Sequence, residues 1–202
     1  MVSKLLRQVM TVALGCVVAT FAVGGLAACA NNDEQAIRAG ITKELDAFKN
    51  PTQASLSSVI DKDNASIGEI RNMGIDPYEF LARCFKGFDY EIRDVKVSDK
   101  TGTVQLHVKN KDLSKAIEYA NQQSQTPENL STLLEIKNAE GENGMVKKYV
   151  EWFYAGIDAT SDVAEKDVTL KVTKGDDGTW NVDDDSIKEL VTATYGGMSL
   201  GE

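Results

Sequence analysis

The chain is poor in the residues that build metal centres and covalent cross-links. Its 202 residues include three cysteines and one histidine, His107. A zinc site needs three or four nitrogen or sulfur ligands, which these residues do not supply. The sequence also has no phosphate-binding glycine loop, no nucleophile elbow and no paired-carboxylate motif. We therefore expect no catalytic residue, no metal and no cofactor.

Basic residues are outnumbered by acidic ones. The 22 lysines and arginines against 31 aspartates and glutamates give a formal net charge of −9. A surface of this sign repels polyanions, so we expect no nucleic-acid partner and no attraction to anionic lipid by charge. The simplest interpretation of the charge is a self-repelling surface domain.

A long apolar run lies near the amino terminus. Lys4 and Arg7 precede an apolar stretch from Val9 to Val23, and small residues lead from there to Cys29. This order is typical of a secretory signal peptide, which we expect to span residues 1–28. The run is marginal for a permanent membrane span, which needs about 20 apolar residues.

The residues that directly precede Cys29 indicate which kind of signal peptide this is. Leu26, Ala27 and Ala28 precede Cys29, and this order resembles the bacterial lipobox. In that family of signals the cysteine thiol receives a diacylglyceryl group, and the peptide is cut just before the cysteine. Two acyl chains anchor a protein stably, whereas one chain gives marginal binding. We expect lipid on Cys29 and a place on the outer face of the cytoplasmic membrane. The alternatives are an ordinary cleavage site and an uncleaved helix with a chance cysteine.

Processing at Cys29 would leave 174 residues, which is 202 less 28, and loss of Lys4 and Arg7 would bring the net charge from −9 to −11. This length suits one domain with a hydrophobic core. We expect residues 29–34 to be the lipidated cysteine and a short polar tether, and residues 35–202 to be a single domain.

Cysteine usage excludes a disulfide framework in that domain. Cys16 would leave with the signal peptide and Cys29 would carry lipid, so Cys84 would remain alone. Cys84 lies on an apolar helix face with Leu81 and Phe85, so we expect a buried thiol rather than a nucleophile, whose thiolate would need stabilisation.

Helical and alternating patterns follow one another along the chain. Helical spacing of apolar residues predicts helices over 33–49, 56–60, 67–73, 77–87, 112–120, 126–136, 145–157 and 185–195. Alternation predicts two hairpins, over 88–108 and 168–182. A loop is expected over 141–144, and a bulge where Arg93-Asp94 shifts the strand phase. The fold class is therefore α+β, with an antiparallel sheet of about four strands in two hairpins packed against several helices.

Several of these segments together resemble a known family. They are Gly74–Pro77, Gly87–Tyr90, Lys109–Ser114, Asp177–Asp183 and Gly196-Gly197. The pattern resembles uncharacterised Gram-positive surface lipoproteins, whose domain of unknown function looks related to the cystatin-like and nuclear-transport-factor-like α+β cones. The resemblance implies a cone-shaped fold in which a small molecule can lie between sheet and helices. It offers no catalytic residues to transfer.

The acidic residues have mostly structural explanations. Asp61–Asp63 begins like a calcium loop but fails at its fifth, sixth and twelfth positions. Asp176-Asp177 and Asp183–Asp185 are expected to form a hairpin turn and a helix cap. Asp89, Glu91 and Asp94 lie near a strand and would serve an isomerase-type or dehydratase-type enzyme if one of them were buried with a raised pKa. His107 is expected on the exposed polar face of a strand.

Aromatic residues cluster over two helical turns, at Tyr149, Trp152, Phe153 and Tyr154. Core packing is the favoured explanation. Trp152 and Tyr154 are the candidates for contact with a ligand.

Three functional hypotheses follow. The first is a lipid-anchored protein that binds a small ligand or peptide in a cleft between sheet and helices. The second is a non-catalytic interaction or structural module of the cell envelope without a pocket. An enzyme of the kind that cone folds host ranks last.

Overall fold

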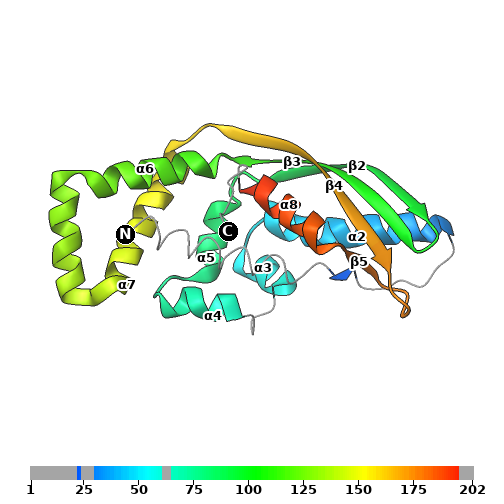
Figure 1. Ribbon diagram of the computed structural model, residues 1–202, viewed down its shortest axis with the longest axis horizontal. Coiled ribbons are helices and arrows are strands. Elements are labelled where there is room, and N and C mark those ends of the chain that lie inside the picture. The colour runs from blue at the N-terminus through cyan, green and yellow to red at the C-terminus, as the bar shows by residue number, and fades with distance from the viewer. Residues whose placement is uncertain (1–21, 24–29, 61–64, 196–202) are drawn as a thin grey trace.

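The computed structural model describes residues 22–23, 30–60 and 65–195 (Figure 1). The helices are α2 (Ala30–Lys49), α3 (Gln53–Val59), α4 (Ala65–Asn72), α5 (Pro77–Cys84), α6 (Leu113–Gln125), α7 (Pro127–Ala159) and α8 (Asp184–Thr194). The strands are β1 (Ala22–Val23), β2 (Asp89–Ser98), β3 (Thr101–Lys111), β4 (Val163–Lys174) and β5 (Trp180–Val182). The predicted α+β class is confirmed.

The strands form one antiparallel sheet in the order β1-β5-β4-β3-β2. The two predicted hairpins are β2–β3 and β4–β5, and the predicted bulge lies between Ile92 and Asp94. The described helices lie on one side of the sheet and leave its other face open (Figure 1). β1 is a two-residue addition at the edge, inside the predicted signal peptide, so processing at Cys29 would remove it.

Helix α2 corrects the prediction of a short polar tether. It begins at Ala30, directly after Cys29, rather than at Asp33. Asp33 is buried, and its Oδ1 accepts hydrogen bonds from Lys174 Nζ at 2.7 Å and Trp180 Nε1 at 3.3 Å. These partners are distant in sequence, so local pattern does not reveal that the first turn of α2 is fixed to the sheet.

The predicted helix starts are confirmed where a capping side chain precedes them. The Asp76 carboxylate accepts the backbone N–H of Tyr78 and Glu79, and Asp112 accepts that of Ser114. Thr126 caps α7 in the same way. The last helix begins earlier than predicted, because Asp183 caps it. Each cap satisfies donors that a helix start leaves unpaired.

Helices α6 and α7 form an arm at one end of the molecule (Figure 1). The loop predicted over 141–144 is instead a kink within α7, where Gly141 takes a φ of +73°. The positive φ is accessible to glycine at little cost. Farther along α7, Gly156 lies against the backbone of Ala116 in α6, and a Cβ there would be 2.7 Å from the Ala116 oxygen. The missing side chain therefore permits the close crossing of the two helices.

Large side chains fill the space between sheet and helices. The ring of Phe85, directly after α5, packs against that of Phe48 in α2, with 4.7 Å between ring centroids, and against that of Tyr195, with 5.6 Å between centroids. Trp180 and Tyr149 are also buried. This packing is the main source of hydrophobic stabilisation in the domain.

Candidate functional site

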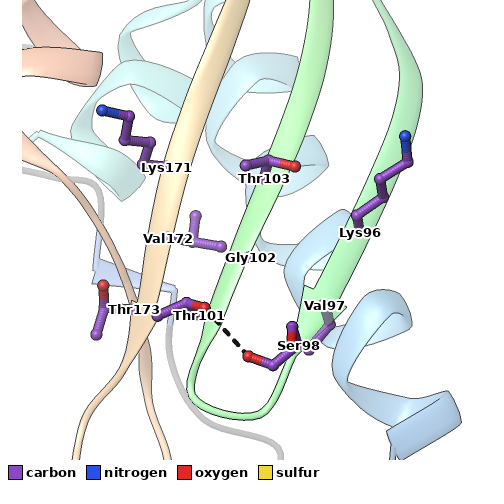
Figure 2. Close-up of a pocket in the computed structure, with 9 residues that line it drawn as sticks. All are labelled: Lys96, Val97, Ser98, Thr101, Gly102, Thr103, Lys171, Val172 and Thr173. Carbon is purple, nitrogen blue, oxygen red and sulfur yellow. Dashed lines mark hydrogen bonds between the residues drawn. The ribbon is translucent and has the colours of Figure 1, made fainter.

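A hollow of about 410 Å³ lies at the end of the sheet beside the β2–β3 turn (Figure 2). We call it the tip hollow. Its lining comes from β2, β3 and β4: Lys96, Val97, Ser98, Thr101, Gly102, Thr103, Lys171, Val172 and Thr173. Since β3 and β4 are joined through α6 and α7, the hollow forms only when the sheet is assembled.

Strand register places the lining residues in rows across the sheet. Lys96 and Lys171 flank Thr103 in one row. In the next row Gly102 stands between Val97 and Val172, and a Cβ on Gly102 would be 2.8 Å from the Lys96 carbonyl oxygen and 3.0 Å from Val172 Cγ2. Neighbouring atoms therefore approach β3 too closely at this position to admit a side chain, which is why glycine is found there.

The tip hollow combines cationic and hydroxyl groups with an apolar part. Lys96 Nζ lies 3.2 Å from Asp94 Oδ2. The Lys171 ammonium makes no ion pair or side-chain hydrogen bond with any residue that the structure describes. The Thr101 hydroxyl donates to the Ser98 carbonyl (Figure 2). Ammonium and hydroxyl donors of this kind suit phosphate or carboxylate oxygens.

The tip hollow lies at the end of the sheet to which α2 is attached. Lys174 follows Thr173 of the lining, donates its backbone N–H to the Lys100 carbonyl at 2.8 Å and pairs with Asp33. Lys174 draws the pKa of Asp33 below its usual value, and the Trp180 hydrogen bond acts in the same direction. The carboxylate is therefore charged at neutral pH and keeps the start of α2 beside the hollow.

A second hollow, of about 230 Å³, lies farther along the sheet and is lined by Asp89, Tyr90, Glu91, His107, Lys109 and Glu165. His107 Nδ1 is 2.7 Å from Asp167 Oδ1, and Arg93 Nη1 donates to the same oxygen at 2.8 Å. His107 and, to a lesser degree, Arg93 lower the pKa of Asp167. His107 is half-buried and oriented by Asp167, a partner that could not be identified from sequence.

The carboxylates of this second hollow do not suit acid catalysis. Asp89 lies 2.6 Å from Lys49 and 3.2 Å from Lys109, and chiefly the hydrogen bond from Lys49 lowers its pKa to about 2. A catalytic acid would need a raised pKa. Glu91 of this hollow is solvent-accessible, as is Asp94, which lies outside it. Among the described residues, no three His, Cys, Asp or Glu side chains are grouped to hold a metal ion.

A third hollow, of about 400 Å³, lies beside the start of α5 and is lined by Gln53, Arg71, Gly74, Ile75, Asp76, Pro77 and Tyr78. The Asp76 carboxylate is already engaged in capping α5. Arg71 is therefore the cationic group of this hollow, and the carboxylate in its lining, Asp76, is occupied by the helix cap.

The two aromatic candidates lie in packed surroundings. Trp152 is 9% exposed. Tyr154 packs its ring against Phe80, with the Arg83 guanidinium carbon 5.1 Å from its centre, and burial raises its phenol pKa. Neither residue lines any of the three hollows. A ligand role for them stays a prediction without support from this geometry.

Other candidates are placed as follows. The Cys84 thiol is buried as predicted, and burial raises its pKa, which opposes a nucleophilic role. The Asp177 carboxylate accepts from Thr179 in the predicted turn. Leu26, Ala27, Ala28, Cys29 and Asp61–Asp63 lie outside the described residues.

Besides Asp33, sequence reasoning missed a second buried carboxyl group. Glu44 of α2 is 7% exposed, one of its oxygens has no hydrogen-bond partner, and burial raises its pKa. Its position on the stripe that includes Ile37 and Ile41 was the available signal, since that stripe faces the core.

No family model, curated protein or solved structure matches the chain. The resemblance to cone-shaped lipoproteins therefore remains a prediction. Among the helices that the structure describes, none is long and apolar enough to cross a membrane.

Proposed function

We propose that the protein is a non-catalytic interaction module of the cell envelope, held on the outer face of the cytoplasmic membrane by lipid on Cys29. The order of Leu26, Ala27, Ala28 and Cys29 supports the anchor. After removal of residues 1–28, and of β1 with them, α2 would begin one residue beyond the anchor.

The observation that carries the interaction role is a pair of exposed leucines on the arm. Leu130 and Leu134 are 49% and 64% exposed. They are four residues apart in α7, so they share one helix face. That part of α7 lies at the opposite end of the molecule from the β2–β3 turn (Figure 1). A domain anchored at its sheet end would present these leucines away from the membrane, where a partner can reach them.

Binding of a small ligand or peptide between sheet and helices is the second candidate. Packing around Phe85, Phe48 and Tyr195 fills that space in the described part of the chain. The tip hollow favours a ligand site of another kind, on the sheet itself.

Site-specific crosslinking in living cells tests the interaction role. A photo-reactive phenylalanine analogue replaces Leu134 in the full-length chain, and the matched control carries it at Glu135, which is exposed on another face of the same helix. We expect a discrete adduct with one envelope protein from position 134, weaker or absent at 135, and lost when Leu130→Asp is added. Equal labelling at both positions, or no adduct at 134, would contradict the proposal.

A further inference from the structure

The tip hollow lies where the proposed anchor would hold the domain against the membrane. α2 begins at Ala30, so no flexible segment separates its first turn from an acylated Cys29. From Ala30 to Asp33 a helix rises about 4.5 Å. Asp33 binds Lys174, which follows the lining residue Thr173 directly. The acyl chains, the start of α2 and the tip hollow are thus confined to one end of the molecule.

We propose that the tip hollow binds the phosphate of a phospholipid headgroup in the membrane that carries the anchor. This rests on the proposed function, because the anchor supplies the location. It goes beyond that function because it assigns the hollow a ligand class and gives the domain a fixed orientation on the bilayer.

Lys171 is the principal phosphate contact, because the other lysines nearby already pair with carboxylates. Lys100 Nζ is 2.9 Å from Asp176, and Lys174 Nζ is 2.7 Å from Asp33. Lys96 is shared with Asp94 at the longer distance of 3.2 Å. Lys171 has no such partner in the described part of the chain. An uncompensated ammonium is the group to which an anion would bind with least competition.

Neutral groups of the hollow fit the rest of a headgroup. Thr103 stands between the two lysines in register, and Thr101 and Thr173 pair in the row nearer the turn. The Thr103 and Thr173 hydroxyls can donate to the remaining phosphate oxygens, whereas the Thr101 hydroxyl already donates to the Ser98 carbonyl. Val97 and Val172 alternate with these residues and point to the other face of the sheet, where Val172 is buried, so they back the hollow and do not contact the headgroup. The hollow, at about 410 Å³, is within the ordinary size of a small-molecule site.

The acidic charge of the whole chain does not oppose this binding at short range. The net charge of −9 repels an anionic bilayer at long range, but salt at 0.1 M screens such fields over about 10 Å. The acyl chains, rather than charge, bring the domain to the lipid. Tethering raises the effective lipid concentration to about the millimolar range, so a weak site is filled.

The test uses acylated protein extracted from membranes in a non-ionic detergent. Dihexanoylphosphatidylglycerol is added in increasing amounts, and mass spectrometry follows the rate at which acetic anhydride modifies each lysine. We expect slower acetylation of Lys171 and Lys96, with no change at Lys115 of α6, which lies toward the other end of the molecule. Unchanged rates at Lys171 would overturn the proposal.

Parallel titrations distinguish the source of the phosphate. Glycerol 3-phosphate carries the charge without acyl chains, and dihexanoylglycerol carries the chains without phosphate. Protection that requires the intact phospholipid supports the proposal. Equal protection by glycerol 3-phosphate overturns the membrane source, and protection by dihexanoylglycerol overturns the phosphate contact.

Matched variants complete the test. Lys171→Gln should weaken binding of dihexanoylphosphatidylglycerol about three- to tenfold, the effect of one solvent-accessible charged contact. Lys115→Gln should leave it unchanged, and both variants should unfold at the wild-type temperature. An identical affinity for Lys171→Gln would overturn the assignment. The intact mass reports acylation separately, so failure of the anchor and failure of the headgroup site give different results.

Discussion

At the scale of single residues, Asn110 connects three elements of the fold. It is fully buried in β3, and its Nδ2 donates to the carbonyls of Cys84 at 2.9 Å and Thr194 at 2.6 Å. Both carbonyls are at helix ends, where backbone acceptors lack helical partners. The side chain therefore fixes the ends of α5 and α8 to the sheet.

Replacement of Asn110 should be costly because it leaves two buried carbonyls unpaired. We expect Asn110→Ala to lower the free energy of unfolding by about 2–4 kcal/mol. The matched control is Asn143→Ala, which removes a bond of the same type to the Asn72 carbonyl at an exposed site. That change should stay within about 0.5 kcal/mol. Urea denaturation compares the two, and equal losses would show that burial of Asn110 does not matter.

The lowered pKa of Asp89 makes the stability of the fold depend on pH. Lys49 first, and Lys109 second, lower its pKa in the folded chain to about 2, against about 3.9 in the unfolded chain. The ionised group thus stabilises the fold above about pH 4, and this contribution is lost as the pH falls toward 2.

Asp89→Asn should therefore be less stable than the wild type at pH 7, by under about 1 kcal/mol because the pairs are partly exposed. The difference should shrink between about pH 4 and pH 2. Urea denaturation at pH 7, 4 and 2.5 measures it. A difference that grows on acidification has the opposite sign and would rule out this role for Asp89.

At the scale of elements, the arm depends on the close crossing of α6 and α7. Gly156→Ala should destabilise the chain by about 1–3 kcal/mol, because the added Cβ meets the backbone of Ala116. Gly68→Ala in α4 is the control, since a Cβ there meets nothing within 4 Å. That change should stabilise the chain by about 0.5–1 kcal/mol. Thermal unfolding that places both variants on the same side of the wild type would contradict the crossing.

The start of α2 depends on a contact with the sheet. Asp33→Ala removes the acceptor for Lys174 and Trp180. We expect faster amide hydrogen exchange in the first two turns of α2, with little change in α6. Unchanged exchange in α2 would mean that the helix start holds its position without Asp33.

Elements whose signals are local could be predicted from the sequence. The helix starts near Pro77 and Thr126 and the bulge after Ile92 depend on residues near one another in the chain, and all are confirmed. The early start of α2 depends on Asp33 meeting Lys174, and no local pattern contains both. α7 turns sharply at Gly141, where the loop was predicted, and the chain is helical on both sides of this residue.

The candidate site was beyond prediction for the same reason. Alternation places Lys96, Thr103 and Lys171 on strand faces, but their alignment in one row requires the register of three strands. Two of those strands are separated by the whole of α6 and α7. Likewise, His107 lies opposite Asp167, 60 positions away in the sequence, because of the β3–β4 register.

At the scale of the whole molecule, the chain has two ends with different roles in our account. The sheet end carries the start of α2, the tip hollow and the position that follows Cys29. The arm end carries Leu130 and Leu134. Lipid on Cys29 would hold the first end at the bilayer and turn the second toward other envelope proteins.

The central claim is that the mature chain begins at a lipidated Cys29. Mass spectrometry of the amino-terminal peptide, from protein isolated from whole membranes, tests it most directly. We predict a peptide that starts at Cys29 and carries the mass of a diacylglyceryl group, and we predict that Cys29→Ser abolishes both cleavage and added mass. An amino terminus within residues 1–28, or an unmodified Cys29, would contradict the anchor and the membrane orientation derived from it.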